Sequence, residues 1–392
     1  MRTLVLHNNA VIAEELRRID VDPLAHSIFT AKADCLALKF DGLSCAQINI
    51  LKQTALVCGA DAAVPRKAYR GGRSRTFCAI LFANRREIEK IEHYLRAQPW
   101  MEKMRQGLAT VLAGGGKPAF KIGPRKFAAD RTYIMGIINL TPDSFYAGQS
   151  YTTPSIVERV IADMIDEGAD LIDIGAESTR PGSMPVDEKE EMRRLRVVLE
   201  KVVKRTRVPV SIDTQKANVA ALALDHGASI INDISGLRSD RSMARVIARN
   251  RAAVVIMHMK GNPRTMQRRP RYKDLMDEVH AFLRERIDYA VDHGIARERI
   301  IIDPGLGFGK RLEDNYTIIN RLAELTDLDR PLLVGHSRKS FIGKPFNLPP
   351  DHRLEGTLGV GSLLIRNGAS ILRVHDVMEA RRVALLTDRI VR

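Results

Sequence analysis

Residues 208–235, VPVSIDTQKANVAALALDHGASIINDIS, contain one complete unit of a pattern that recurs along most of the chain. A short apolar run ends in the polar residues Asp213 and Thr214, a helical stretch follows, and Gly227 precedes the next apolar run. Apolar runs of this length are typical of strands that are buried on both faces, as in parallel sheets. Glycine just beyond a helix readily adopts the left-handed conformation that ends the helix. The stretch is therefore predicted to fold as strand, helix, glycine turn and strand.

The same pattern occurs eight times after residue 130. The eight apolar runs end at Asn139, Glu177, Thr214, Ser235, Met259, Gly307, Ser337 and Asp376. Four of the runs are entered through similar turns, EGAD, HGAS, HGIA and NGAS. Eight strand–helix units over roughly 260 residues are typical of a closed eightfold barrel. An open, doubly wound sheet is the alternative, but it has fewer strands, and no GxGxxG follows the first run. We therefore predict an α/β protein with a (β/α)8 TIM barrel over residues 131–392.

The chain before the barrel has a different organisation. Residues 107–130 are rich in glycine and proline, which indicates a linker between domains. The GGGK sequence in this linker lacks the first glycine and the Ser/Thr of a phosphate-binding P-loop. Residues 1–106 are predicted to contain alternating strands and helices, which favours a small α+β domain of ferredoxin-like type. This domain carries no recognisable catalytic residues, and its role is left open.

Composition limits the function classes. The 392 residues carry a formal net charge of +15, which indicates an anionic partner. Aromatic residues make up only 5%, and no RNA-binding motif is present, so a phosphorylated small molecule fits at least as well as nucleic acid. No run of about 18 apolar residues predicts a membrane span, and no secretion signal is recognisable. The four cysteines form no CxxC pair, so we expect reduced thiols in a cytoplasmic protein.

Polar side chains follow the predicted barrel strands. In such barrels the reacting groups lie at the carboxyl ends of the strands, where all the ends meet at one mouth. Crowded carboxylates without a partner are energetically costly, so a ligand is expected among them. The predicted strand ends supply Asn139, Asp173, Asp213, Asn232, His258, Asp303, Lys339 and His375.

The motifs at these strand ends resemble those of a known enzyme family. INLTPDSF (138–145) and DLIDIGAESTRPG (170–182) resemble the two signature segments of the dihydropteroate synthases, the pterin-condensing enzymes of folate synthesis. The similarity continues in the same order through SIDT, INDIS, MHMKGNPRTMQ, DPGLGFGK, GHSRKSFIG and RVHDV, and covers essentially all of residues 131–392. Ala176 is one departure, since the family often has glycine there. Residues 1–130 lie outside the common core of the family.

The resemblance implies a transferase reaction. A (7,8-dihydropterin-6-yl)methyl diphosphate condenses with 4-aminobenzoate to give 7,8-dihydropteroate, and diphosphate is released. It further implies Mg²⁺ as cofactor, inhibition by sulfonamides, which imitate aminobenzoate, and a homodimer as the common assembly. Nucleic acid and membranes are not expected as partners.

The resemblance also implies subsites for the pterin and the diphosphate. Asp213, Asn232 and Asp303 would pair with the amino-pyrimidinone edge of the pterin, because carboxylates accept its N–H groups and an amide can both donate and accept. Lys339 would donate to the acceptor side of the ring. Arg373 and His375 would bind diphosphate, and Asn139 would ligate Mg²⁺ through its amide oxygen.

Further roles fall on the loops after the first two strands. Asp143 would stabilise positive charge on the pterin methylene, and Asp173 would orient the anion-binding groups. The residues expected to frame 4-aminobenzoate are Phe145, Thr179, Arg180, Pro181, Lys339 and Ser340, and the catalytic set is Asp143, Asp173, Arg180 and Lys339. The arylamine is neutral near pH 7, so its attack requires no strong general base.

Two alternatives remain at this point. A pterin-dependent methyltransferase shares the barrel and the pterin pocket but has no use for diphosphate-binding residues, so SRKS and RVHD disfavour it. A non-catalytic module that binds nucleic acid through its basic surface is the alternative from another class, and salt-sensitive binding would reveal it.

Overall fold

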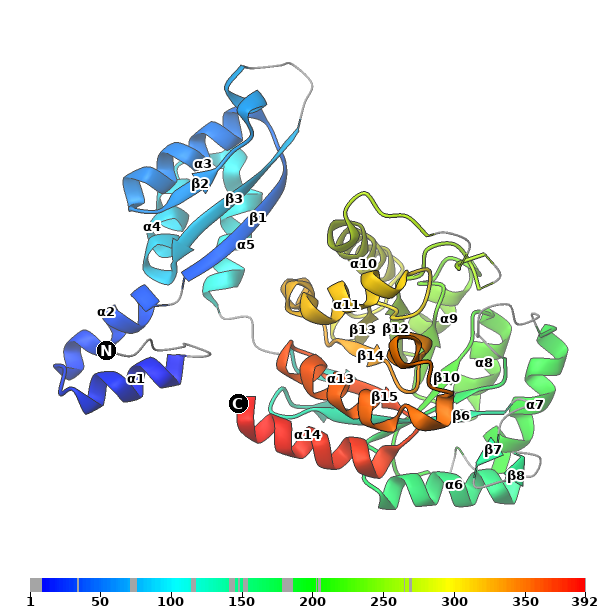
Figure 1. Ribbon diagram of the computed structural model, residues 1–392. Coiled ribbons are helices and arrows are strands. Elements are labelled where there is room, and N and C mark those ends of the chain that lie inside the picture. Colours follow the sequence, from blue (N-terminus) through cyan, green and yellow to red (C-terminus); the bar gives the residue numbers. More distant parts are fainter. Residues whose placement is uncertain are drawn as a thin grey trace. The chain divides into compact units, whose positions relative to one another are not determined.

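The computed structural model describes residues 9–33, 35–70, 76–113, 118–140, 145–146, 149–150, 154–177, 186–201, 203, 206–263, 265–267 and 270–391. The chain forms two compact units, Met1–Gly115 and Gly116–Arg392, which are described separately (Figure 1).

The first unit is built around a three-stranded antiparallel sheet in the order β1-β3-β2. Its strands are β1 (Cys35–Leu43), β2 (Asp61–Ala63) and β3 (Phe77–Asn84), and its helices are α1 (Asn9–Arg18), α2 (Pro23–Ala33), α3 (Cys45–Cys58), α4 (Arg85–Leu95) and α5 (Glu102–Leu112). The order β1, α3, β2, β3, α4 is the order of a ferredoxin-like unit without its last strand. The described residues of this unit contain no fourth strand.

Burial along β3 alternates, so one face of the sheet is covered and the other is exposed. Leu81 on the covered face belongs to a core cluster with Leu51 of α3 and with Ile88 and Ile91 of α4, and all four are fully buried. The first unit therefore has its own hydrophobic core.

The second unit is an eight-stranded parallel barrel (Figure 1), as predicted. Its strands are β6 (Tyr133–Asn139), β9 (Leu171–Gly175), β10 (Val210–Asp213), β11 (Ile230–Asp233), β12 (Ala253–Met257), β13 (Ile300–Asp303), β14 (Leu333–Gly335) and β15 (Ile371–Val374). Seven pairings give the order β13-β12-β11-β10-β9-β6-β15-β14. A parallel bridge from Ile302 to Leu332 joins the two ends and closes the barrel.

Helices cover the outside of this barrel. They are α6 (Pro154–Asp166), α7 (Glu188–Lys201), α8 (Ala217–Asp225), α9 (Met243–Arg249), α10 (Leu275–Asp292), α11 (Leu312–Asn320), α13 (Leu354–Arg366) and α14 (Val377–Val391), with the short α12 (Ser340–Gly343) after β14. The four predicted turn glycines, Gly168, Gly227, Gly294 and Gly368, all have φ between 90° and 102°. This confirms that left-handed glycines end these helices.

A β-hairpin closes the bottom of the barrel. Strands β4 (Phe120–Ile122) and β5 (Arg125–Phe127) pair with each other. Phe120, Ile122 and Phe127 are buried in one cluster with interior residues of the barrel strands, such as Leu171 and Ile301. Part of the segment expected to be a linker, 107–130, is therefore ordered: α5 ends within it, the division between the two units falls after Gly115, and the hairpin belongs to the second unit. The glycine- and proline-rich composition indicated a linker, although the segment also contains three apolar residues whose burial stabilises the hairpin.

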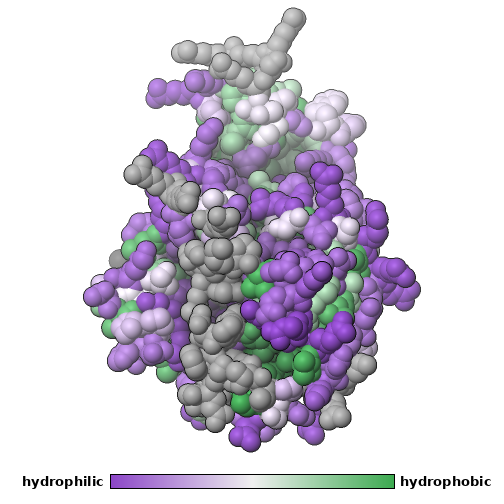
Figure 2. Space-filling view, turned by 90° about the vertical axis from the view of Figure 1, so that its right-hand side faces the viewer, coloured by the Kyte–Doolittle hydropathy of each residue, from purple (hydrophilic) through white to green (hydrophobic). Residues whose placement is uncertain are grey.

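The barrel interior changes character along its axis. The bottom is filled by apolar side chains, among them Met135, Val255, Leu333 and Ile371. Toward the carboxyl ends the inward positions become polar, which defines the mouth of the barrel. Hydrophilic residues dominate the outer face of this unit that Figure 2 shows. Among the described residues, no helix is long and apolar enough to cross a membrane.

Candidate active site

Four neighbouring strands bring side chains to one level of the barrel mouth. In the register of β6 and β9, Asn139 lies opposite Gly175. Across β10, Asp213 lies opposite Gly175 on one side and opposite Asn232 on the other. Opposite residues in neighbouring strands project to the same face of a sheet, so these residues form one layer of the interior.

Gly175 contributes no side chain to that layer. A Cβ atom built on Gly175 would lie 3.5 Å from Cβ of Asp213 and 3.7 Å from Oδ1 of Asn139. Gly335 of β14 lies in a similar position, where a Cβ atom would be 3.7 Å from Cδ of Arg373 and 4.0 Å from Nζ of Lys339. At both positions a methyl group would contact the polar side chains of the mouth directly.

Arg373 is the centre of a buried network. Its Nε donates to Oδ2 of Asp173 at 2.6 Å, and its terminal nitrogen donates to Oδ2 of Asp213 at 3.1 Å. Asn232 donates to the same Oδ2 of Asp173 at 3.3 Å. The other oxygen of Asp173, Oδ1, is buried and has no hydrogen-bond partner among the described residues. Buried polar atoms are normally paired, so this oxygen indicates space for a water molecule or a ligand.

The charged groups of this network shift one another's pKa values. Burial raises the pKa of Asp213 to about 8; the Arg373 guanidinium opposes the rise, and the Asp173 carboxylate adds to it. Arg373 itself is held in its charged form, because the two carboxylates outweigh its burial and raise its pKa. Asp213 therefore carries a proton more readily than an exposed aspartate, until a donor binds its carboxylate.

A second group lies across the mouth, on the loops after β13 and β14. Lys339 donates from Nζ to the carbonyl oxygen of Leu306, and this ammonium lies 4.6 Å from the centre of the Phe308 ring. Burial lowers the pKa of Lys339 to about 8, while Asp303 opposes the change. The carboxylate of Asp303 accepts a bond from the backbone N–H of Gly305 at 2.7 Å, and burial raises its pKa.

Lys310 stabilises this loop from below and was not predicted as a functional residue. Its buried Nζ lies 2.8 Å from Nδ1 of His258, 3.1 Å from the carbonyl oxygen of His258 and 3.1 Å from that of Phe308. Burial lowers the pKa of both Lys310 and His258 well below the usual range. His258, expected at the mouth, is thus buried and, through its contacts with Lys310, connects the loops after β12 and β13. The DPGLGFGK motif contained Lys310, but only the fold shows this contact.

Of the remaining predicted residues, the structure describes His375 and Ser340 in full and only the backbone of Phe145. His375 lies just past β15, and its Nδ1 is 3.0 Å from Oγ of Ser337. Ser340 is exposed at the start of α12. Phe145 pairs through its backbone with Ser150 in the hairpin of β7 (Phe145–Tyr146) and β8 (Gln149–Ser150), and its side chain lies outside the described part of the chain. The other four, Asp143, Thr179, Arg180 and Pro181, lie outside the described residues.

The donor set at the mouth is compatible with Mg²⁺. Asn139 offers an amide oxygen, and its side chain makes no hydrogen bond to any residue that the structure describes. The described residues contain no group of three or more His, Cys, Asp or Glu side chains that could hold a metal ion. Mg²⁺ usually keeps several waters and binds through one or two protein oxygens together with phosphates, so a single amide oxygen fits this cation.

Comparisons with known proteins agree with this geometry. The family described as pterin binding enzyme matches residues 135–375. The dihydropteroate synthase of Clostridium beijerinckii is 43% identical to the chain, over 69% of this chain and 99% of its own length. The dihydropteroate synthase of Escherichia coli K12 is also 43% identical, over 65% of this chain and 91% of its own length.

Solved structures give the same result. The Yersinia pestis dihydropteroate synthase with a sulfonamide drug complex aligns with a TM-score of 0.67 at 38% identity, over 69% of this chain and 98% of that one. The Xanthomonas albilineans dihydropteroate synthase with 4-aminobenzoic acid aligns with a TM-score of 0.65 at 40% identity, over 70% and 98%. The chain belongs to the dihydropteroate synthase family of pterin-binding enzymes and is a transferase of folate synthesis.

Proposed function

We propose that the mouth of the barrel binds both substrates of dihydropteroate synthesis and that its residues divide into three subsites. The observation that supports this most strongly is the convergence of Asp213, Asn232, Asp303, Lys339 and Arg373, which come from five separate strand ends or loops. The family relationship favours this reaction, and nothing favours the methyltransferase alternative.

The pterin subsite consists of Asp213, Asn232 and Asp303, with Lys339 on the opposite edge of the ring. The carboxylates accept N–H groups of the amino-pyrimidinone edge, and Lys339 donates to a ring acceptor. The raised pKa of Asp213 supports this assignment, because an N–H donor from the ligand replaces the water that burial removed. A pocket that pairs every polar edge discriminates against rings that leave one group unpaired.

The diphosphate subsite consists of Arg373 and His375, with Asn139 as the Mg²⁺ ligand. Arg373 already spans Asp173 and Asp213, so its position is fixed before the substrate arrives. When bound, Mg²⁺ supplies positive charge to the oxygens of the leaving diphosphate. Asp173 is the residue that orients Arg373, and Asp143 is proposed to stabilise positive charge on the pterin methylene.

The aminobenzoate subsite draws on the loops after β6, β9 and β14. Thr179, Arg180 and Pro181 frame the ring, Phe145 covers it, and Lys339 with Ser340 lies near its carboxylate, with Arg180 and Lys339 also in the catalytic set. Relatives solved with a sulfonamide or with 4-aminobenzoic acid support an aminobenzoate site in this chain. We therefore expect sulfonamides to compete with 4-aminobenzoate.

The homodimer is a separate proposal. The described helices α13 and α14 expose the apolar side chains of Leu363, Leu385, Leu386 and Ile390, with 51%, 49%, 62% and 72% of their surfaces accessible. Exposed apolar side chains on two helices that contact each other are candidates for an interaction site, and a second copy of the chain is the proposed partner. Sedimentation of the full chain, with Leu386→Glu expected to dissociate the dimer, tests it.

The cellular location and the division of the chain are also proposals. Four cysteines without a CxxC pair are compatible with a reducing cytoplasm. The barrel, residues 131–392, is proposed as the catalytic unit, with the hairpin of β4 and β5 from segment 107–130 packed against its bottom, and no role is assigned to residues 1–106.

Diphosphate release tests the proposed reaction. The purified full chain, supplied with pterin diphosphate, 4-aminobenzoate and Mg²⁺, is expected to release diphosphate and form dihydropteroate in equal amounts. Release of neither product would reject the proposed function, and diphosphate release without dihydropteroate would reject the aminobenzoate subsite.

A further inference from the structure

A buried ion-pair cluster lies beside the active-site mouth and is not part of the three subsites. Lys216, in the loop between β10 and α8, donates from Nζ to Oε2 of Glu177 at 2.7 Å and also to Oε2 of Glu191. Glu191 belongs to α7, and its side chain is fully buried; the side chains of Glu177 and Lys216 are 13% and 24% exposed. We refer to these three residues as the Glu177 cluster.

The carboxylate of Glu177 connects two parts of the chain. Its Oε1 accepts a hydrogen bond from the backbone N–H of Val186 at 3.1 Å. Glu177 is the last described residue before residues 178–185, and Val186 is the first after them. One carboxylate therefore bonds directly across the base of this segment, while Lys216 holds the other oxygen of the same group.

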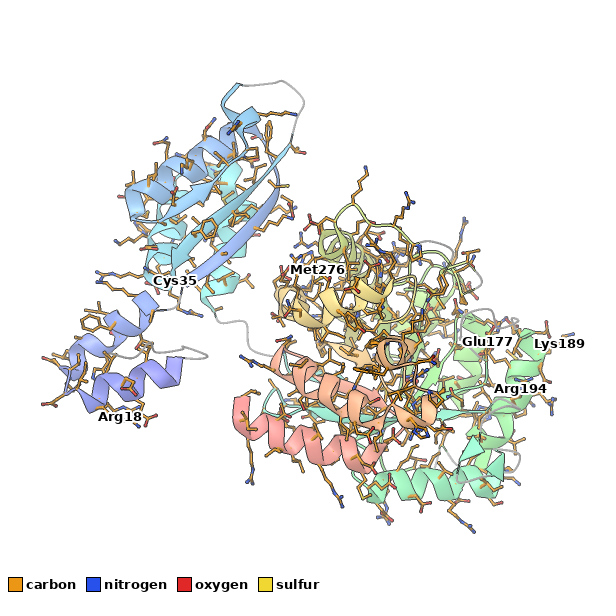
Figure 3. The ribbon with its side chains drawn as sticks, in the orientation of Figure 1. Arg18, Cys35, Glu177, Lys189, Arg194 and Met276 are labelled. Carbon is orange, nitrogen blue, oxygen red and sulfur yellow. The ribbon has the colours of Figure 1, made fainter. Side chains whose placement is uncertain are left out.

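A second contact fixes the same strand end from α7. Arg194 donates to the carbonyl oxygen of Ala176 at 3.0 Å and to Oε1 of Glu190 at 2.8 Å. Figure 3 labels Glu177 and Arg194 on this side of the barrel, with Lys189 also on α7. The end of β9 is thus tied to α7 through Arg194 and again through Lys216 and Glu191.

The cluster is also linked to the pterin subsite. Lys216 lies three positions after Asp213 in the chain. The charge of Glu191 contributes to the raised pKa of Asp213. For Glu191 itself, burial raises the pKa and Lys216 opposes the rise. Glu191 without Lys216 would be an uncompensated buried charge, which indicates that the three residues act as one unit.

We propose that Glu177 is a positioning residue, which joins both ends of segment 178–185 through its carboxylate, and that Lys216 and Glu191 hold this carboxylate in place. The inference rests on the proposed function, in which Thr179, Arg180 and Pro181 frame 4-aminobenzoate. A substrate site that is displaced by about 1 Å loses catalytic efficiency, so the anchoring of the two ends affects aminobenzoate more than the pterin.

The test separates the two substrates. Glu177→Ala is expected to raise KM for 4-aminobenzoate about tenfold or more, while the Kd for pterin diphosphate changes by about twofold or less. Glu177→Gln retains an oxygen for Val186 N–H but loses the ion pair, so an intermediate KM is expected. The control is Lys189→Met, which removes an exposed charge from α7, the helix that carries Glu191. This variant should match the wild type in the KM for 4-aminobenzoate and in the Kd for pterin diphosphate.

The ion pair between Lys216 and Glu191, here called the inner pair, is tested with a double variant that leaves no unpaired buried charge at these two positions. Lys216→Met combined with Glu191→Gln removes both charges, and Lys216→Arg retains the cation as a rescue variant. The combined variant should raise KM for 4-aminobenzoate to a similar extent as Glu177→Ala, and adding Glu177→Ala should raise it little further, because coupled residues are not additive.

The outcomes are distinguishable. An active wild type whose Glu177→Ala variant keeps the KM for 4-aminobenzoate, or loses pterin and aminobenzoate binding alike, would overturn the positioning role. A wild type that makes no dihydropteroate would instead reject the proposed function. The inference is supported if KM for 4-aminobenzoate rises selectively in Glu177→Ala and in the combined Lys216→Met and Glu191→Gln variant. Lys216→Arg, which keeps the cation, should stay closer to the wild type than the combined variant.

Discussion

Arg373 and Asp173, 200 positions apart in the chain, form a bond of 2.6 Å between Nε and Oδ2 inside the barrel. The bond joins side chains of the last strand, β15, and the second strand, β9, which lie on either side of β6 in the sheet. Because Asp173 is fully buried and Arg373 also reaches Asp213, two carboxylates depend on one guanidinium. Arg373, proposed to bind the diphosphate, and Asp213, proposed to bind the pterin, thus share one electrostatic unit.

Removal of the guanidinium should therefore destabilise the protein as well as weaken diphosphate binding. Arg373→Met leaves the buried carboxylate of Asp173 without its cation and Asp213 without its hydrogen-bond donor, for which we expect a loss of about 3–5 kcal/mol in the free energy of unfolding. Adding Asp173→Asn removes one of the charges and should recover part of this loss. Urea unfolding at pH 7 measures the stability of both variants. An Arg373→Met variant as stable as the wild type would contradict a stabilising role for the Arg373 network.

Pterin binding should change the protonation of two groups in opposite directions. A donor on Asp213 lowers its pKa from about 8, so the complex releases a proton at pH 7, where the free carboxyl is mostly protonated. An acceptor near Lys339 raises its pKa from about 8, so the complex takes up a proton at pH 9, where the free amine is mostly neutral.

Calorimetry of pterin binding in buffers of different ionisation enthalpy measures this exchange. The expected result is a net release at pH 7 that Asp213→Asn removes, and a net uptake at pH 9 that Lys339→Met removes. Binding without any change in protonation at either pH would show that neither group contacts the ring.

Lys310 should contribute to stability and to the shape of the pterin subsite. Lys310→Met leaves two buried carbonyl oxygens and Nδ1 of His258 without their donor, so we expect a loss of about 3 kcal/mol in the free energy of unfolding. Exposed Lys344→Met is the control and should change stability by less than about 0.5 kcal/mol. Equal effects of the two substitutions in urea unfolding would argue against the role of Lys310.

Gly175→Ala should separate folding from function. The added Cβ atom meets Asp213 and Asn139 at ordinary contact distances, and Gly175 is not among the glycines with positive φ, so stability should change by less than about 1 kcal/mol. The methyl group nevertheless contacts a proposed pterin ligand and the proposed Mg²⁺ ligand. Turnover is expected to fall by about tenfold or more, and a fully active variant would show that no substrate binds against Gly175.

The periodic part of the sequence was sufficient to predict the barrel. The eight apolar runs and the four turn glycines are local features, and the structure shows the strands and left-handed turns where these features predicted them. The hairpin at 120–127 was not predicted, because three apolar residues among glycines and prolines have no periodicity. In residues 1–106 the structure also has α2 directly after α1 and a 3-10 turn at Arg66–Arg70 between β2 and β3, neither of which the predicted alternation of strands and helices includes.

The site was predictable only as a set of strand ends. Some of the predicted strand-end residues, Asp173, Asp213 and Asn232, do lie together, since the polar residue after each apolar run is a local signal. The sequence held no information about which side chains contact one another, because the bonds from Lys310 to His258 and from Lys216 to Glu177 span 52 and 39 positions. Such contacts depend on the register of the barrel and on the packing of α7, which no local pattern encodes.

A crystal structure of the full chain with pteroic acid bound tests the central claim most directly. We predict the pterin ring inside the mouth, with its N–H groups within about 3 Å of the carboxylates of Asp213 and Asp303 and of the amide of Asn232, and the benzoate directed toward Ser340. Density for the ring at any other place, with these three side chains free of ligand, would contradict the account.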